Sequence, residues 1–189
     1  MKSILLSIKP KYVADILNGK KTIEIRKTCP KCDLPIDVYI YCSKGKTTVI
    51  NMDKYLFGNP NDAIRNGKVV AKFTLRKVEE IIHDFSHFSP FCHTRELTSQ
   101  KLYDKSCLSY NEIDNYLKGK TGYALHIEDL VIFDKPKELS EFHKIGFSEW
   151  CAEHPPILSL IEPKKCYEEL KQFMITKAPQ SYCFVESEE

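Results

Sequence analysis

Gly-Lys-Lys-Thr-Ile-Glu-Ile-Arg, at residues 19–26, is the stretch that decides how this chain begins to fold. Side chains alternate between the two faces of a β-strand, so Glu24 and Arg26 share one face and the two isoleucines point towards a core on the other. Lys21 stands where the strand begins, just after a glycine that ends a helix. The segment therefore places two cations and a carboxylate on one rigid element. This group suits a polar ligand or acid–base chemistry, and a solvated strand face with a local ion pair is the alternative.

The flanking sequence predicts a small mixed sheet around this strand. Pro10 opens a short helix that Gly19 ends, and Ser109 with Glu112 has the spacing of a capping box. Residues 83–108 read as irregular. The predicted strands lie at 4–8, 22–26, 36–42, 68–78, 122–133 (ended by Pro136) and 178–185, and the predicted helices start at Pro10, Ser109 and Pro163. Several short strands with few helical crossovers indicate an α+β fold built on a partly open mixed β-barrel with peripheral helices.

Length and composition are those of one globular domain. The chain has 189 residues, of which 42% are hydrophobic and 29% charged. No apolar run approaches a membrane span, and the start reads as a strand rather than a secretory signal, so we expect a cytoplasmic protein with no membrane partner. Residues 1–46 hold 10 Lys/Arg against 4 Asp/Glu, and residues 138–189 hold 5 against 10. A basic N-terminal part suits a phosphate-bearing partner, unless the two ends neutralise each other.

The eight cysteines include one C-x-x-C, Cys29-Pro-Lys-Cys32. A zinc knuckle needs four ligands, which only Cys42, or Cys92 with His93, could complete by folding nearby. A thioredoxin-like role requires a strand-to-helix turn, but the flanks here are strand-like. The favoured interpretation is a hairpin tip with two free thiols. We therefore predict no metal and no cofactor.

Several motifs follow one another along almost the whole chain. They are Leu5-Leu-Ser-Ile-Lys-Pro10, Gly19-x-Lys21-x-x-Glu24-x-Arg26, Tyr39-Ile-Tyr41, Gly67-Lys-Val-Val-Ala, Tyr116-x-x-Gly119-Lys120-x-Gly122-Tyr-Ala, Pro136-x-x-Leu139 and Ala178-Pro-Gln-Ser-Tyr182. In this order they resemble the ASCH domain (activating-signal-cointegrator homology) of the PUA-like superfamily. The resemblance implies a single ASCH/PUA-like domain over 1–189, with helical insertions near 80–118 and 143–177.

The resemblance also implies a function. The family fold is a β-barrel with helices around its openings, and its expected ligand cleft has the G-x-K-x-x-E-x-R segment on its wall. RNA, a nucleotide or a modified nucleoside is the expected partner. One bacterial branch of the superfamily hydrolyses the amide of N4-acetylcytidine with a lysine, a threonine and a glutamate. The lysine matches Lys21, but Glu24 stands where that branch has its threonine, and no residue here is matched to its glutamate.

We expect the ligand to be held by charge and by stacking. The lysines and Arg26 would neutralise phosphates, with Arg26 offering a planar fork, and Glu24 would accept from a base amino group. Tyrosines, with Tyr39 and Tyr123 as further candidates, would stack a base for about 1–3 kcal/mol. The predicted ligand-binding residues are Lys9, Lys21, Glu24, Arg26, Tyr41, Tyr116 and Lys120.

Two other classes of function remain open at this point. As a hydrolase of an N4-acylcytidine-like nucleoside, the chain would use Lys21 and Glu24 as catalytic residues. A metal-free ribonuclease would add His126 or His93 as a second acid–base group. As a protein-interaction module, it would instead present Phe147 and Trp150 from the helical addition at 143–177.

Overall fold

The computed structural model describes residues 1–51, 56, 64–86, 90–154 and 163–186. The strands are β1 (Lys2–Ile8), β2 (Ile23–Arg26), β3 (Ile36–Cys42), β4 (Val69–Leu75), β5 (Val78–Asp84), β6 (Phe91–His93), β7 (Gly122–His126), β8 (Glu128–Lys137) and β9 (Tyr182–Glu186). The helices are α1 (Pro10–Leu17), α4 (Ser99–Ser106), α5 (Tyr110–Leu117), α6 (Phe147–Glu153) and α8 (Pro163–Leu170), with a 3₁₀ turn at Leu139–Glu141.

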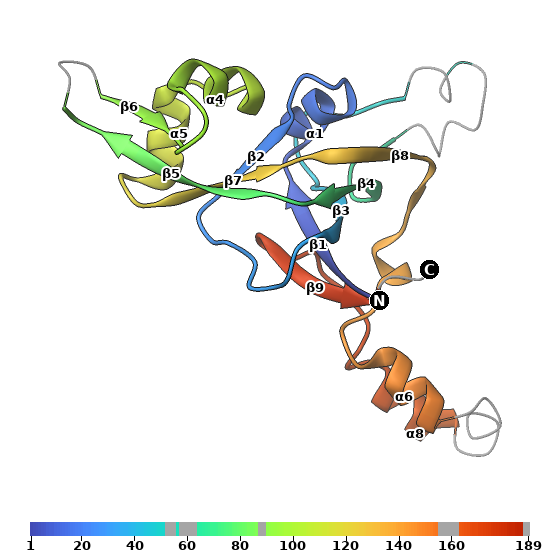
Figure 1. Ribbon diagram of the computed structural model, residues 1–189. Helices are drawn as coiled ribbons and strands as arrows, with labels where there is room; N and C mark the ends of the chain where they lie inside the picture. Colours follow the sequence, from blue (N-terminus) through green and yellow to red (C-terminus); the bar gives the residue numbers. More distant parts are fainter. Residues whose placement is uncertain (52–55, 57–63, 87–89, 155–162, 187–189) are drawn as a thin grey trace.

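Two sheets form a partly open barrel, as the α+β prediction required. The five-stranded sheet has the order β8-β4-β3-β1-β9 and the four-stranded sheet the order β2-β7-β5-β6. β1 and β3 run parallel, while the other strand pairs within the sheets are antiparallel. Figure 1 shows α1 beside the body of the barrel and α4 with α5 packed next to β5, β6 and β7. The helices are therefore peripheral.

The alternation of the strands divides the buried residues between three cores. The main core takes one face of β1 and β3, including Leu6 and Ile40, together with α1. The second core contains Ile23 and Ile25 of β2, which confirms the predicted alternation of that strand. The third core lies on the opposite face of the five-stranded sheet, because Leu5, unlike its neighbour Leu6, belongs to it.

Helix α1 forms as its sequence predicts. Pro10 lies in its first turn, and Val13 and Ile16 are fully buried against the main core. Gly19 follows with a φ of +69°, a conformation that glycine adopts without steric cost. This turn leads directly into β2 and so fixes the position of Lys21.

Two predicted strands are each divided in the structure. Residues 68–78 form β4 and β5, which lie in different sheets, and residues 122–133 form β7 and the start of β8, also in different sheets. Both breaks lie at one corner of the barrel, where Arg76 forms ion pairs with Glu128 and Asp129. Asp129 has a φ of +48°, which turns the backbone there. The apolar pattern continues through the corner, which is why the sequence pattern did not reveal it.

Two further sequence predictions are wrong and a third is confirmed. Residues 83–108, predicted to be irregular, contain β6 and α4, because α4 buries only Leu102 and Ser106 and so has little apolar signal. Pro136 does not end its strand: β8 continues to Lys137, and as an edge strand it tolerates a residue without an N–H. The capping box of Ser109 with Glu112 at the start of α5 is confirmed.

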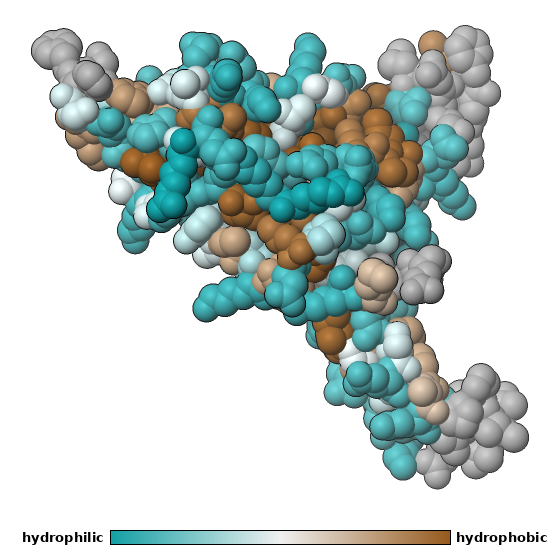
Figure 2. Space-filling view, viewed as in Figure 1, coloured by the Kyte–Doolittle hydropathy of each residue, from teal (hydrophilic) through white to brown (hydrophobic). Residues whose placement is uncertain are grey.

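Helices α6 and α8 form an arm that projects from the barrel (Figure 1). Trp150 stacks on His154 at 4.6 Å between ring centroids and lies 6.0 Å from Phe173, so its side chain is half-buried within the arm. Glu186 of β9 accepts hydrogen bonds from the backbone N–H groups of Gly146 and Ser148, which joins the arm to the sheet. Figure 2 shows hydrophilic residues over most of this side of the molecule, with hydrophobic patches on the body. Among the described residues, no helix has the length and apolar character needed to cross a membrane.

Candidate functional site

Lys21, Glu24 and Arg26 meet in one ion-pair cluster. Lys21 Nζ lies 3.3 Å from Glu24 Oε2, and Arg26 Nη2 lies 3.2 Å from Glu24 Oε1. The exposed fractions of the three side chains are 1%, 7% and 9%. The cluster is therefore not the solvated strand face that was the alternative to a site, because its charges are almost completely removed from water.

Backbone carbonyls from two other elements hold the two cations. Lys21 Nζ donates to the carbonyl oxygen of Ser106, at the end of α4, at 2.6 Å, and Arg26 Nη2 donates to that of Ser7 in β1 at 2.6 Å. The ring of Tyr12 also faces the Lys21 ammonium, with its centroid 5.3 Å away. Each cation thus has a neutral acceptor in addition to the carboxylate, as buried charges require.

The cluster keeps some hydrogen-bonding capacity. Among the described residues, neither Glu24 Oε2 nor Arg26 Nε has a hydrogen-bond partner, although both atoms are buried and Oε2 has its ion pair with Lys21. One is an acceptor and the other a donor, and they belong to side chains on the same face of β2. Buried polar groups of this kind are rare in native proteins and require an explanation.

The cluster faces the main core. Glu24 and Arg26 lie opposite Leu125 and Tyr123 in β7, and directly opposed residues of an antiparallel pair share a face. Leu125 belongs to the main core, and the half-buried Tyr123 packs against it. Tyr123, a candidate for base stacking, therefore lies beside Arg26.

An exposed pair of side chains lies just past the end of β2, on the side where α5 packs. Lys27 follows Arg26 directly, and its ammonium lies 4.9 Å from the ring centroid of Tyr116 in α5. Tyr116 is 38% exposed. A second contact, between Lys11 Nζ and Glu112 at 3.5 Å, connects α1 to α5 on the surface. We call Lys27 and Tyr116 the rim pair.

The remaining predicted ligand-binding residues are not all brought to the cluster. Tyr41 is buried in the third core, across the five-stranded sheet from the main core that the cluster faces. Burial raises its pKa. Tyr39 lies in the same core, with its ring 4.9 Å from that of Phe142. Lys9, before α1, and Lys120, after α5, are exposed.

Sequence reasoning missed several residues of this site. Ser7 and Ser106 contribute backbone carbonyls, which leave no side-chain signal, and α4 was not predicted at all. Tyr12 reads as one more residue of an amphipathic helix. Of these residues, only Lys27 could have been suspected from the sequence, because it continues the run of charged residues in the strand.

The two histidines proposed as acid–base groups lie apart from the cluster. His126 is opposite Ile23 in register, so it is on the second-core face of β7, away from Tyr123 and Arg26. Its Nε2 lies 2.5 Å from Glu79 Oε2, and Thr94 Oγ1 donates to Glu79 Oε1 at 2.6 Å. His93 Nδ1 lies 2.8 Å from the carbonyl oxygen of Thr94.

The network around Glu79 predicts a pH effect on stability. Burial works towards a higher pKa, but hydrogen bonds with Thr94 and His126, together with the nearby ammonium of Lys77, hold the pKa of Glu79 below its usual value. A lowered folded-state pKa gives stability that is present above the unfolded-state pKa of about 4.3 and is lost as the pH falls through the folded value. The free energy of unfolding of the wild type should therefore fall more steeply with acid than that of Glu79→Gln.

Urea denaturation of both proteins between about pH 6 and about pH 3 would measure this difference. Glu80→Gln, at an exposed position next to it in β5, is the control and should follow the wild type throughout. A wild-type advantage over Glu79→Gln that is the same at every pH would contradict the prediction.

The C-x-x-C segment does not form the predicted hairpin tip. Cys29 and Cys32 lie between β2 and β3, which belong to different sheets, so this segment is a crossover. A hairpin is not formed because β3 pairs with β1 and β4 instead of β2. Cys42 is in the main core and Cys92 in the second, where burial raises their pKa values to about 12 and about 11. Neither thiol of the C-x-x-C forms a disulfide within the part of the chain that the structure describes.

Known proteins share this architecture. The family model of the ASCH domain matches residues 6–180. The crystal structure of an ASCH protein from Zymomonas mobilis is similar, with a TM-score of 0.53 and 16% identity over 97% of this chain and 87% of that chain. A tyrosine-to-phenylalanine variant of the Z. mobilis protein gives a TM-score of 0.51 and 16% identity, over 98% and 91% of the two chains. At this level of identity, the similarity establishes the fold alone. No curated protein matches the sequence.

Proposed function

Because the chain belongs to the ASCH domain family, with its PUA-like fold, we propose that it binds single-stranded RNA or a nucleotide at the Lys21–Glu24–Arg26 cluster. The base would enter beside β2, and the rim pair would contact the adjoining part of the ligand. The two cations and the carboxylate are then the binding residues of the G-x-K-x-x-E-x-R segment.

The unused hydrogen-bonding capacity of the cluster carries this proposal. Glu24 Oε2 can accept and Arg26 Nε can donate, and both are buried without a hydrogen-bond partner among the described residues. The edge of a nucleobase presents a donor and an acceptor side by side, whereas a phosphate presents acceptors only. A base edge would therefore satisfy both atoms, and a phosphate could satisfy only Arg26.

The rim pair supplies a cation for phosphate and an exposed aromatic ring, which the buried cluster lacks. Lys21 donates to the Ser106 carbonyl and pairs with Glu24, so its charge is already balanced within the fold. Lys27 is exposed and can neutralise a phosphate, and Tyr116 offers an exposed ring on which a base can stack. The cluster would then contact the edge of one base, and the rim pair would contact a phosphate and the face of a base.

The salt dependence of RNA binding tests the proposal. We expect a fluorescein-labelled single-stranded RNA to bind with an affinity that falls as salt rises, measured by fluorescence anisotropy at several salt concentrations. Lys27→Ala should weaken binding and reduce the slope of log K against log[salt] by about 0.7, the value for one single-strand phosphate contact.

Lys171→Ala is the matched control. Lys171 lies over Tyr167, with its ammonium 4.8 Å from the ring centroid, in the same way that Lys27 lies over Tyr116, but it belongs to the arm. The control should bind as the wild type does. Equal slopes for all three proteins would show that the rim makes no phosphate contact, and an absence of binding at low salt would overturn the RNA proposal.

The formation of product would distinguish the two hydrolase alternatives from binding alone. A nucleoside amidohydrolase would release acetate from N4-acetylcytidine, and a ribonuclease would shorten the labelled RNA during the titration. We expect neither, because the Lys21 ammonium is held by three partners and His126 lies on the other face of β7. Chromatography of the nucleoside and gel analysis of the RNA after incubation would detect either product.

A further inference from the structure

The C-x-x-C segment is a motif that nucleotide binding does not use. Cys29 Sγ lies 3.5 Å from the carbonyl oxygen of Pro30, and Cys32 Sγ lies 3.9 Å from the same oxygen. Both thiols therefore lie close to the same carbonyl oxygen, in the crossover between β2 and β3. Both cysteines are half-buried, and the crossover is anchored by Tyr182, whose hydroxyl donates to the carbonyl oxygen of Cys29 at 3.3 Å.

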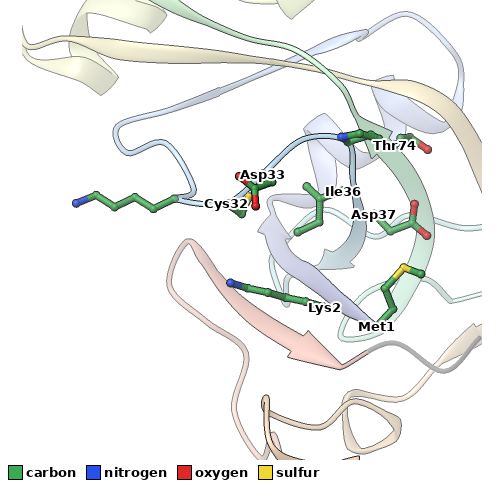
Figure 3. A pocket seen from close by; sticks show the side chains of 9 residues that line it. Met1, Lys2, Cys32, Asp33, Ile36, Asp37 and Thr74 are labelled. Atoms are coloured by element: carbon green, nitrogen blue, oxygen red, sulfur yellow. The ribbon is translucent and has the colours of Figure 1, made fainter.

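A pocket of about 820 Å³ adjoins this crossover at the beginning of β1 and β3, and it is separate from the nucleotide-binding cluster. Cys32, Asp33 and Lys31 line it from the crossover, and Lys2 lines it from β1. Figure 3 shows Cys32 and Asp33 beside each other, with Lys2 extending along the same side of the pocket. Cys32 thus lines a pocket to which the cationic residues Lys2 and Lys31 also contribute.

The electrostatics keep the pair protonated in the absence of a ligand. Burial raises the pKa of both thiols, and for Cys32 the ammonium of Lys2 opposes this effect. Thiols of this kind are poor nucleophiles at neutral pH, which disfavours a role in thiol–disulfide catalysis. A metal ion that prefers sulfur can nevertheless displace the two protons, because the thiolate is the ligand form.

The number of ligands selects the kind of ion. Within the described part of the chain, no group of three or more His, Cys, Asp or Glu side chains is placed to hold a metal. Structural zinc takes four ligands and calcium or magnesium takes six or more oxygens, so two sulfurs alone suit neither. Soft thiolate ligands select Cu(I), a monovalent ion that two sulfurs can hold.

We propose that Cys29 and Cys32 form a two-thiolate site for Cu(I), with Cys32 at the wall of the pocket that Lys2 and Lys31 also line. Binding forms two S–Cu bonds and releases two protons to solvent, with no change in oxidation state. The complex carries one net negative charge, and the ammonium of Lys2, whose charge acts on the Cys32 thiol, is placed to offset it.

Competition with a chromogenic Cu(I) chelator tests this site in the full-length protein. Under reducing, oxygen-free conditions, the wild type should remove Cu(I) from bicinchoninate and release two protons for each ion taken up in an unbuffered titration. Cys29→Ser and Cys32→Ser should each lose this high-affinity binding. Cys151→Ser, which changes an exposed cysteine on the arm, should retain it.

The alternatives give different results. If all four proteins compete equally, other thiols bind the copper and the proposal is wrong. If the reduced pair instead closes to a disulfide when mixed with glutathione disulfide and does not compete for Cu(I), the segment is a redox pair and not a metal site. X-ray absorption of the copper-loaded wild type should show two sulfur neighbours, and additional or non-sulfur neighbours would also overturn the proposal. None of these readouts depends on RNA binding.

Discussion

Glu24→Ala should lower the free energy of unfolding by about 3–5 kcal/mol, because it leaves Lys21 and Arg26 buried with no carboxylate between them. The backbone carbonyls of Ser106 and Ser7 still accept from the two cations, but neutral acceptors do not compensate two buried charges. Urea denaturation at neutral pH measures the change as a shift of the midpoint.

Glu80→Ala is the matched control for this loss. Glu80 also lies in a strand, but it is exposed, so removing its carboxylate should change stability by no more than about 0.5 kcal/mol. Replacing Lys21, Glu24 and Arg26 together by methionine, leucine and methionine should restore much of the stability, because no unpaired charge remains. A cost for Glu24→Ala below about 1 kcal/mol would mean that water reaches the cluster.

Tyr116→Ala should weaken the binding of single-stranded RNA by about 5- to 140-fold, the equivalent of about 1–3 kcal/mol of base stacking. The side chain is 38% exposed, so its removal should leave the fold intact. Anisotropy titration at one low salt concentration gives the ratio of dissociation constants directly. Tyr116→Phe keeps the ring and should bind as the wild type does.

Tyr167→Ala provides the comparison that separates stacking from general surface effects. Tyr167 is 55% exposed and lies under Lys171, as Tyr116 lies under Lys27, but it is on the arm. Its replacement should leave RNA affinity unchanged. Equal weakening by both changes would place the RNA on a diffuse surface, and an unchanged affinity for Tyr116→Ala would remove the rim pair from the site.

Sequence reasoning predicted the elements that have a strong local signal. The helix from Pro10, the alternation of β2 and the capping box at Ser109 depend on residues close together in the chain, and the structure contains all three. The barrel corner at Arg76 depends on contacts with Glu128 and Asp129, more than 50 residues away, which no local pattern reveals. The two long predicted strands were therefore not divided.

The same distinction applies to the site. Lys21, Glu24 and Arg26 are close in sequence, and their contact followed from strand geometry and spacing. The near-complete burial of the three side chains could not be predicted in this way, because it depends on β1 and α4, whose backbone carbonyl groups cover the cations. Tyr41 fits the alternation of β3, but the pattern alone does not show which sheet face turns towards the cluster.

The pairing of β1 with β9 has a consequence for synthesis of the protein on the ribosome. Ser3 pairs with Val185, so β1 leaves the ribosome long before β9, its second neighbour in the sheet, has been synthesised. At about 5–20 residues per second, that interval is roughly 10–40 s. Throughout it, one side of β1 is an unpaired sheet edge, which is a template for association with other nascent chains. Slow translation should therefore favour aggregation of this protein, and a chaperone that covers exposed edges should relieve it.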